Sequence, residues 1–354
     1  MQKKFGFGII GCGAIGDIHA KSINNTDGAK LIAVSDINLE KAKIFGREYN
    51  VEYYQDYKKL LECKDIDVVS ICLPSGMHMQ SCVDAAEAGK NILCEKPLEV
   101  TLDKIDHINE VVRKNNVKLG VVFQKRFQEL SRRVKEALED EKLGNVISGS
   151  IYIKYYRSQE YYDSGSWRGT WKYDGGGCLM NQGIHDVDLL QWFLGPAKSV
   201  YAIIDTVAHK GIEVEDIAVA VIRFKNGAKG IIEASTSCYP GFPSLLQIYG
   251  TLGTITLRDD KITDWKFINP TEEDLNFSKQ ILEQKNVELE DIDRSNPIAV
   301  LKNRHKYQIE DMIRAINNNV VPEITGEEAR KSVEIIQAIY KSSCIGEEVT
   351  LPLN

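Results

Sequence analysis

The sequence predicts an α/β protein with two parts, a parallel, doubly wound sheet first and a mainly antiparallel sheet with helices second. Its 354 residues exceed the usual size of a single hydrophobic core. Up to residue 123, short apolar runs alternate with stretches of helical periodicity, which is typical of parallel sheets. Beyond it, longer runs alternate apolar and polar residues, which favours antiparallel strands. We therefore expect domains at 1–123 and 124–354.

The first part reads as strand and helix in turn. We expect strands at 5–10, 31–36, 67–73, 91–94 and 117–123. We expect helices at 16–26, 39–49, 56–63, 78–89 and 101–115. A nucleotide bound by such a sheet lies at the carboxyl ends of its strands.

The second part begins with a predicted helix at 128–142. Strands are expected at 146–157, 198–209, 214–225, 228–238, 244–250 and 253–258, and further helices at 181–194, 303–318 and 326–342. The turn at Lys225-Asn226-Gly227 indicates a hairpin. Residues 259–299 are acidic and lack apolar periodicity, with Pro270 and Pro297 near the ends, so we expect an irregular excursion there.

Composition limits the class of protein. Hydrophobic residues make up 43% of the chain and charged residues 27%, as in ordinary globular proteins. The net charge of −7, without a long basic block, argues against a nucleic-acid partner. No apolar stretch approaches the roughly 20 residues of a membrane span, and nothing resembles a signal peptide. We expect a cytoplasmic protein that does not enter a membrane.

Eight cysteines are scattered through apolar stretches. None forms a CxxC pair and no cluster has the spacing of zinc ligands. We interpret them as small buried hydrophobic residues in a reducing compartment, and expect no metal site.

The run Gly11-Cys12-Gly13-Ala14-Ile15-Gly16 follows the first strand and predicts a dinucleotide site. Gly11, Gly13 and Gly16 allow a tight turn, close approach of a pyrophosphate and helix packing. Ala14 and Ile15, which lie between these glycines, are expected to contact the cofactor. Asp36 lies 36 − 16 = 20 residues further on, the spacing of a carboxylate that binds the adenosine ribose. The alternative is that these glycines serve only the structure, as a strand–turn–helix that binds no nucleotide.

The same carboxylate predicts which cofactor is used. Asp36 would repel the 2′-phosphate of NADP, and no arginine follows at Ile37 or Asn38. We therefore expect NAD, with NADP disfavoured.

Two loops are expected beside the cofactor. The third strand ends in Leu73-Pro74-Ser75 and leads to His78, which is either a cofactor contact or a helix residue without a chemical role. The fourth strand ends in Glu95-Lys96-Pro97. A partly buried ammonium needs a partner, which Glu95 could supply. Lys96 would then donate to a substrate hydroxyl, whereas the alternative is a surface lysine in a loop.

The second part supplies a glycine-rich segment, Asp174 to Asp188. Asn181 and His185 stand at i and i+4, so one helix face carries both, and Asp188 could orient the imidazole. A lone helix histidine is more often structural, but this one follows three consecutive glycines.

An aromatic segment precedes those glycines and offers flat faces to a sugar. Arg157 and Arg168 within it could bind a carboxylate or diphosphate, Arg168 being the preferred contact. The alternative is a hairpin whose aromatic rings pack on the sheet or in a subunit interface.

Together these motifs resemble the Gfo/Idh/MocA oxidoreductase family over essentially the whole chain. The resemblance rests on the glycine fingerprint, Glu95-Lys96-Pro97, the segment leading to His185, and Gly326-Glu327-Glu328-Ala329. It implies a Rossmann domain followed by a domain with an open, mainly antiparallel sheet. It also implies that Lys96 and His185 flank the nicotinamide and that the Lys96-Pro97 peptide is cis.

One position departs from the family pattern. Many members carry aspartate where this chain has Asn181, which cannot take a proton, so His185 is the expected base and Asn181 orients the substrate. The sequence pattern of Asn181 together with Gln159–Asp163 and Trp167–Trp171 is similar to that of UDP-N-acetylglucosamine-uronate 3-dehydrogenases. Alternatives are a dehydrogenase of free sugars, inositols or polyols, and a non-catalytic NAD-binding regulator. The family also implies a homo-oligomer, a dimer or tetramer.

Overall fold

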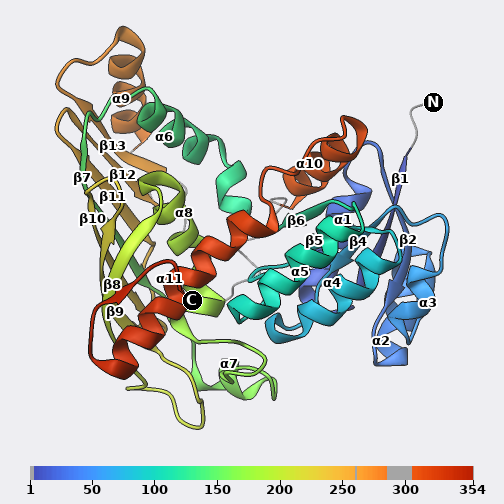
Figure 1. Cartoon of the computed structure of the whole chain (residues 1–354). Coiled ribbons are helices and arrows are strands. Elements are labelled where there is room, and N and C mark those ends of the chain that lie inside the picture. Colours follow the sequence, from blue (N-terminus) through green and yellow to red (C-terminus); the bar gives the residue numbers. More distant parts are fainter. Residues whose placement is uncertain (1–3, 260, 285–304, 354) are drawn as a thin grey trace. The chain divides into compact units, whose positions relative to one another are not determined.

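The computed structural model describes residues 4–259, 261–284 and 305–353. These fold into two compact units. Unit 1 is drawn from Met1–Gln124, Lys172–Asp174 and Leu301–Arg330, and unit 2 from Lys125–Trp171, Gly175–Val300 and Lys331–Asn354. The chain thus returns to unit 1 after the central part of unit 2 (Figure 1).

Unit 1 contains a six-stranded parallel sheet in the order β3-β2-β1-β4-β5-β6. Its strands are β1 (Phe5–Ile10), β2 (Ala29–Ser35), β3 (Glu52–Tyr54), β4 (Val68–Ile71), β5 (Asn91–Cys94) and β6 (Leu119–Val121). Every residue of β1 and β4 is buried because both are interior strands of a sheet covered on two faces. The reversal of strand order between β1 and β4 creates the crevice where such sheets bind nucleotides.

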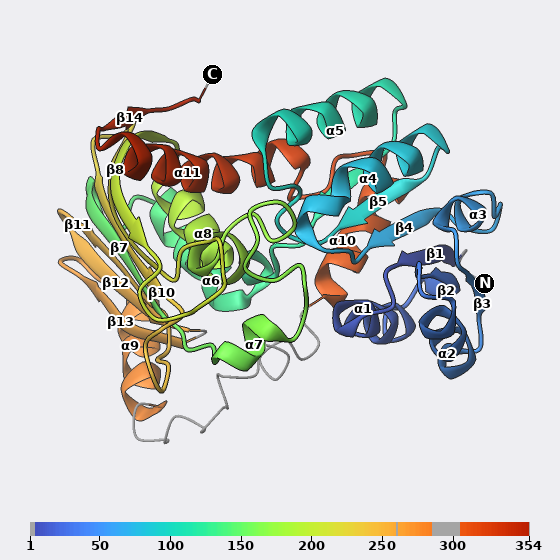
Figure 2. The ribbon, with the colours of Figure 1, turned by 90° about the horizontal axis from the view of Figure 1, so that it is seen from below.

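Helices cover both faces of this sheet. They are α1 (Ala14–Asn24), α2 (Leu39–Tyr49), α3 (Tyr57–Leu61), α4 (His78–Glu87), α5 (Leu102–Lys114) and α10 (Lys306–Asn317). Figure 2 shows α4 and α5 together on one face and α1 with α10 on the other, in agreement with the contacts of each pair. The short segment 172–174 joins unit 1 because the Gly76 N–H donates to the Tyr173 carbonyl at 2.8 Å.

Unit 2 contains an eight-stranded mixed sheet in the order β13-β12-β11-β7-β10-β9-β8-β14. Its strands are β7 (Val146–Lys154), β8 (Ala197–Asp205), β9 (Ile217–Phe224), β10 (Lys229–Ser235), β11 (Leu245–Gly250), β12 (Gly253–Arg258), β13 (Lys261–Phe267) and β14 (Val349–Thr350). The β7–β10 pair is parallel and the other pairs are antiparallel.

The described helices of unit 2 are α6 (Glu129–Glu139), α7 (Gln159–Asp163), α8 (Ile184–Leu194), α9 (Glu272–Gln284) and most of α11 (Gly326–Ile345). Figure 2 shows α8 and α11 on the same face of the sheet. Ser342 and Ser343 of α11 accept hydrogen bonds at 3.0 Å from β8 backbone N–H groups. Along β9 buried and exposed residues alternate, so one sheet face is covered and the other is open.

The predicted fold class is confirmed. Most predicted elements fall close to their expected ranges, whereas β3, α7 and β14 were not predicted. The expectation of an irregular excursion at 259–299 is wrong where the structure describes it, since β13 and α9 occupy much of that segment. Trp265 explains the order, because it packs edge-on against Phe277 of α9 and donates to Asp274. Pro297 lies outside the described residues.

The cysteines follow the prediction with one exception. All eight are free thiols, and seven are buried or half-buried. Cys344, near the end of α11, is exposed instead, because its helical position faces away from the sheet that Ser342 contacts. Among the described helices, none combines the length and apolar character needed to span a membrane.

Candidate cofactor and substrate sites

The glycine loop between β1 and α1 has two kinds of glycine. Gly11 has φ of +105°, and a Cβ there would lie 2.4 Å from the Cys72 carbonyl oxygen. A Cβ on Gly16 would lie 2.1 Å from the Gly11 oxygen. A Cβ on Gly13 would meet no atom within 4 Å. Gly11 and Gly16 therefore serve the fold, whereas Gly13 borders open space.

That open space adjoins the start of α1, at Ala14 and Ile15. Gly13 is the N-cap, and no side chain caps the helix there. The first N–H groups of a helix lack intrahelical acceptors and attract anions. The loop therefore fits a pyrophosphate: it offers donors, and Gly13 leaves room for close approach.

Asp36 directly follows β2, and its carboxylate is hydrogen-bonded to the glycine loop. Its Oδ2 accepts from the Cys12 N–H at 3.0 Å, and its Oδ1 accepts from the Asn38 N–H at 2.8 Å. Each carboxylate oxygen retains a second lone pair for a hydroxyl donor. The half-buried Asp36 thus fits the ribose role expected from its spacing.

The loop after β4 is partly built by His78. Leu73 and Pro74 are half-buried, and Ser75 begins a 3₁₀ turn, Ser75–Met77. The His78 ring is buried, with Nδ1 2.9 Å from the Pro97 carbonyl and Nε2 2.9 Å from the Leu73 carbonyl. Both ring nitrogens thus face backbone oxygens. His78 links the two loops and so supports them, while its direct contact with the cofactor stays a prediction.

Glu95 also has partners other than those expected. Its buried Oε1 accepts from Nε2 of His19 and of His305, each at 3.0 Å, while Oε2 accepts from the Lys96 backbone N–H at 3.2 Å. Burial alone would raise the pKa of Glu95, but the two imidazoles hold it well below its usual range. These contacts add two imidazole partners that the sequence did not predict, while the expected contacts of Glu95 with the Lys96 ammonium and with the cofactor stay predictions.

The sequence did not reveal the two histidines as partners of Glu95. They lie 76 and 210 positions from it along the chain, and no motif connects them. His19, Glu95 and His305 are also of metal-ligand type, and all three are buried. The hydrogen bonds account for their arrangement, and burial lowers the pKa of His19, which favours its neutral form.

Lys96 is the second residue after β5 and is half-buried. Its peptide bond to Pro97 is cis, as the family resemblance implies. Its backbone is held on one side by Glu95, and on the other by the carbonyl of Pro97 bound to His78. The lysine thus stands on a turn that two buried side chains fix.

In unit 2, Asn181 and His185 lie at the junction of two helical forms. A π-helical turn, Cys178–Gly183, leads directly into α8, so the regular helix starts later than predicted. Such turns occur frequently at functional sites. Asn181 lies within the turn, His185 is the second residue of α8, and both are half-buried.

Glu215 anchors the start of this turn. Its carboxylate accepts from the N–H groups of Gly177 and Leu179, both at 2.9 Å, and from the Tyr340 hydroxyl at 3.0 Å. Burial raises the pKa of Glu215, while the backbone donors oppose that rise. The carboxylate supplies acceptors to N–H groups that have none inside the helix.

Asp188 has partners that the sequence did not predict. Arg126 binds it in a bidentate pair, with Nε 2.7 Å from Oδ2 and Nη2 2.6 Å from Oδ1, and Ser332 donates at 2.7 Å. All these residues belong to unit 2. These three donors anchor α8 through Asp188, and the predicted orientation of the His185 ring by Asp188 stays a prediction.

Arg157 and Arg168 are in contrasting positions. Arg157 is buried and donates to Gln182, whereas Arg168 is partly exposed and lies over the rings of Tyr161 at 4.2 Å and Trp167 at 4.6 Å. Arg168 is therefore the more accessible cation for an anionic ligand. Tyr162 fits the alternative in which the aromatic rings pack against the sheet, because it is buried and its hydroxyl lies 2.9 Å from the Thr236 hydroxyl.

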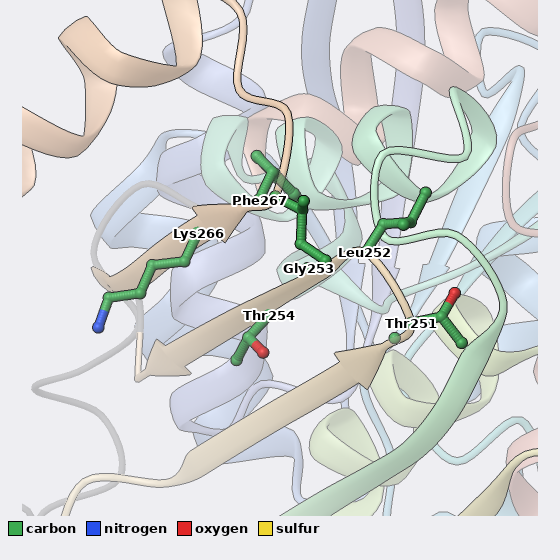
Figure 3. A pocket seen from close by; sticks show the side chains of 8 residues that line it. Thr251, Leu252, Gly253, Thr254, Lys266 and Phe267 are labelled. Carbon is green, nitrogen blue, oxygen red and sulfur yellow. The ribbon is translucent and has the colours of Figure 1, made fainter.

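Figure 3 shows a pocket elsewhere in unit 2, at the turn between β11 and β12. It is lined by Gly250, Thr251, Leu252, Gly253, Thr254, Lys266, Phe267 and Ile268. None of these residues was predicted for the site. The lining offers one ammonium and two hydroxyls without a buried charged group, so we assign it no chemistry.

Two family models match this chain. A family described as "Oxidoreductase family, NAD-binding Rossmann fold" matches residues 5–123. A second, described as "GFO/IDH/MocA C-terminal domain", matches residues 131–256. Myo-inositol 2-dehydrogenase of Thermotoga maritima is 31% identical over 254 residues, which cover 70% of this chain and 73% of that protein.

Two solved structures resemble the whole chain. They are the WlbA dehydrogenases from Bordetella pertussis and Chromobacterium violaceum, both in complex with NADH and UDP-GlcNAcA, and each is 29% identical to this chain. The first covers 99% of this chain and 100% of its own, with a TM-score of 0.88. The second covers 99% and 97%, with a TM-score of 0.89.

Proposed function

We propose that this chain, which belongs to the GFO/IDH/MocA oxidoreductase family, oxidises the 3-hydroxyl of a UDP-linked N-acetylhexuronic acid. The family binds NAD, and its dehydrogenases act on CH–OH groups of sugars and polyols. The observation that carries the finer proposal is the 29% identity, over 99% of the chain, to enzymes solved with UDP-GlcNAcA.

In the proposed site the glycine loop and Asp36 hold NAD. The bound NAD would accept the hydride from the sugar carbon. Gly13 leaves room for the pyrophosphate, and Asp36 accepts from the ribose hydroxyls. Leu73, Pro74 and Ser75 border the cofactor, on a loop that His78 supports.

The proton is handled by side chains of this chain. His185 removes the proton of the reacting hydroxyl as general base, and Lys96 donates a hydrogen bond to the same oxygen. Asn181 orients that oxygen. Arg168, partly exposed on aromatic rings, is the proposed contact for a carboxylate or diphosphate of the substrate.

A second candidate is oxidation of a free inositol or polyol. It is favoured by the 31% identity to a myo-inositol 2-dehydrogenase, although that match covers 70% of this chain. A third, a non-catalytic NAD-binding regulator, would have no need of Lys96 and His185, and this chain has both.

One panel of substrates tests the proposal. We expect NAD reduction with UDP-N-acetylglucosamine-uronate, and kcat/KM at least tenfold lower with myo-inositol or free hexuronic acids. Lys96→Met and His185→Asn should each lower kcat by roughly 10²-fold to 10⁴-fold, because each removes a donor or base, while the Kd for NAD changes little. Preferred turnover of inositol would select the second candidate, and full activity of either variant would overturn its assigned role.

We further propose that the protein is a cytoplasmic homo-oligomer that uses the open face of the unit 2 sheet. Tyr201 of β8, Val221 of β9 and Ile231 of β10 pair across the three strands on this face. Their side chains are 42%, 52% and 39% exposed. A row of exposed apolar side chains on a sheet favours burial against a second copy.

A further inference from the structure

Gln182 lies beside Asn181 in the π-helical turn, and its side-chain amide makes every hydrogen bond that it can make. Its Oε1 accepts from Arg157 Nε at 3.2 Å and from Nη2 at 2.9 Å. Its Nε2 donates to the Tyr161 hydroxyl at 2.8 Å and to Asn181 Oδ1 at 3.1 Å. An amide has two donors and two acceptor lone pairs, and these contacts employ all four.

Arg157 decides which way this amide points. A guanidinium has donors only, so it requires an acceptor, and Oε1 of Gln182 provides it. A flipped amide would place N–H against N–H. Arg157 is also buried, and its Nη1 donates to the Tyr156 carbonyl at 2.8 Å, which fixes the guanidinium in place.

The direction passes on to Asn181. Because Gln182 presents N–H to Asn181, the Asn181 oxygen must face Gln182, and its Nδ2 must face away. Each bond in the series Arg157, Gln182, Asn181 then donates in the same direction. Hydrogen bonds in such a chain polarise one another, and the first donor carries a full positive charge.

We propose that Gln182 is a positioning residue, which fixes the Asn181 amide so that its N–H, polarised by Arg157, donates to the reacting oxygen. The inference rests on the proposed dehydrogenase activity but not on which sugar is oxidised. As the hydride leaves carbon and His185 takes the hydroxyl proton, electron density on that oxygen is stabilised by a pre-oriented donor. Arg157 thereby acts through two amides rather than as an anion contact, which remains with Arg168.

A double-mutant cycle tests this with whichever sugar or polyol the enzyme turns over. Gln182→Met and Asn181→Ala should each lower kcat on the order of tenfold to 100-fold, with a smaller change in KM. In the Asn181→Ala background, Gln182→Met should cost less than about twofold further, because its effect passes through Asn181. Additive losses would overturn the proposal.

Two conservative variants separate donation from packing. Gln182→Glu keeps oxygens for Arg157 but loses both N–H donors, so its kcat should fall as in Gln182→Met. Asn181→Asp can accept from Gln182 but cannot donate, so it should be as slow as Asn181→Ala. Wild-type kcat in either variant would refute the donor assignment. Gln191→Met makes the same change further along α8, at a buried Oε1 without a hydrogen-bond partner, and should leave kcat unchanged.

A measurement without substrate keeps the inference independent of the proposed function. In protein labelled with ¹⁵N at glutamine amides, the Gln182 NH₂ signals are those lost in Gln182→Glu. They should shift in Asn181→Ala, since the Nε2 contact at 3.1 Å is removed. Unchanged signals would contradict the hydrogen-bond chain, whereas shifted signals without turnover of any substrate would leave the chain intact and reject the dehydrogenase activity.

Discussion

At the residue scale, two glycines of the loop between β1 and α1, Gly13 and Gly16, are required for different reasons. Gly16 lets α1 approach the first strand's end, since a Cβ there would lie 2.1 Å from a backbone oxygen. Gly13 has an ordinary extended backbone, with φ −93° and ψ −171°, and open space where a Cβ would stand. The fold therefore requires glycine at 16, and only a ligand requires it at 13.

Alanine at these two positions should separate folding from binding. Gly13→Ala should keep the melting temperature within a few degrees while weakening NAD binding about tenfold or more, because the methyl group occupies the pyrophosphate's approach. Gly16→Ala should lose roughly 1–3 kcal/mol of folding free energy through overpacking. Thermal denaturation and NAD titration measure both. Unimpaired NAD binding in Gly13→Ala would contradict the loop's assignment.

Asp36 should determine the choice between NAD and NADP. Its carboxylate is held by the N–H groups of Cys12 and Asn38, so a 2′-phosphate there would meet a fixed negative charge. Asp36→Ser combined with Asn38→Arg should raise the kcat/KM ratio of NADP over NAD by roughly tenfold or more. Steady-state kinetics with both cofactors measures the ratio, with Asn38→Arg alone as the control. A wild-type preference for NADP would reject the role of Asp36.

At the scale of elements, buried carboxylates hold the segments that surround the substrate-side residues. Asp216 accepts from the N–H groups of Val207, Ala208 and His209 at 2.9, 2.9 and 3.0 Å, and so fixes the connection between β8 and β9. The His209 ring in turn lies 2.7 Å from the Arg157 carbonyl oxygen. The connection thereby supports the backbone of the arginine that binds Gln182.

This arrangement predicts a stability that depends on pH. Burial would raise the pKa of Asp216, but the backbone donors and His209 lower it overall. A carboxyl group with a lowered folded-state pKa stabilises the fold above its unfolded pKa of about 4, and this stabilisation is lost as the pH falls through the folded-state value.

Asp216→Asn should therefore cost about 1–3 kcal/mol at pH 7, because the amide offers one acceptor where the carboxylate offered two. The difference from wild type should shrink below pH 4, as the wild-type carboxylate takes up its proton. Urea denaturation at several pH values measures this dependence. A difference that stays constant down to pH 2 would contradict it.

At the scale of the whole molecule, the open sheet face of unit 2 predicts self-association. Val221 faces Tyr201 on one side and Ile231 on the other, at the centre of the apolar row. Val221→Lys should release the subunits, because burying an ammonium without a partner costs several kcal/mol. Light scattering after gel filtration measures the mass. Arg223→Lys, at an already charged and exposed position of the same strand, serves as the control. A wild-type monomer at micromolar concentration would reject the interface.

Local patterns predicted most of the fold. Parallel strands, helix order and the glycine turn follow from periodicity and spacing, since each involves residues close in sequence. The strand β13 and the helix α9 escaped prediction because they depend on contacts of Trp265 with Phe277 and Asp274, which hydrophobic periodicity does not reveal. Unit 1 also includes the described residues 305–330, where α10 contacts α1 and β5, and a prediction made from local patterns does not reveal such a return of the chain.

The sequence by itself determined that a dinucleotide loop, Asp36, Lys96 and His185 occur at the spacing of an oxidoreductase, because backbone turns and helix faces are local consequences of residue order. The tertiary structure decided the partners of the polar side chains. Glu95 takes two distant imidazoles, Asp188 takes Arg126, and Gln182 joins Asn181 to Arg157, which lies 25 positions away. These pairings satisfy buried hydrogen-bonding groups across the fold, so they depend on packing that residue spacing does not encode.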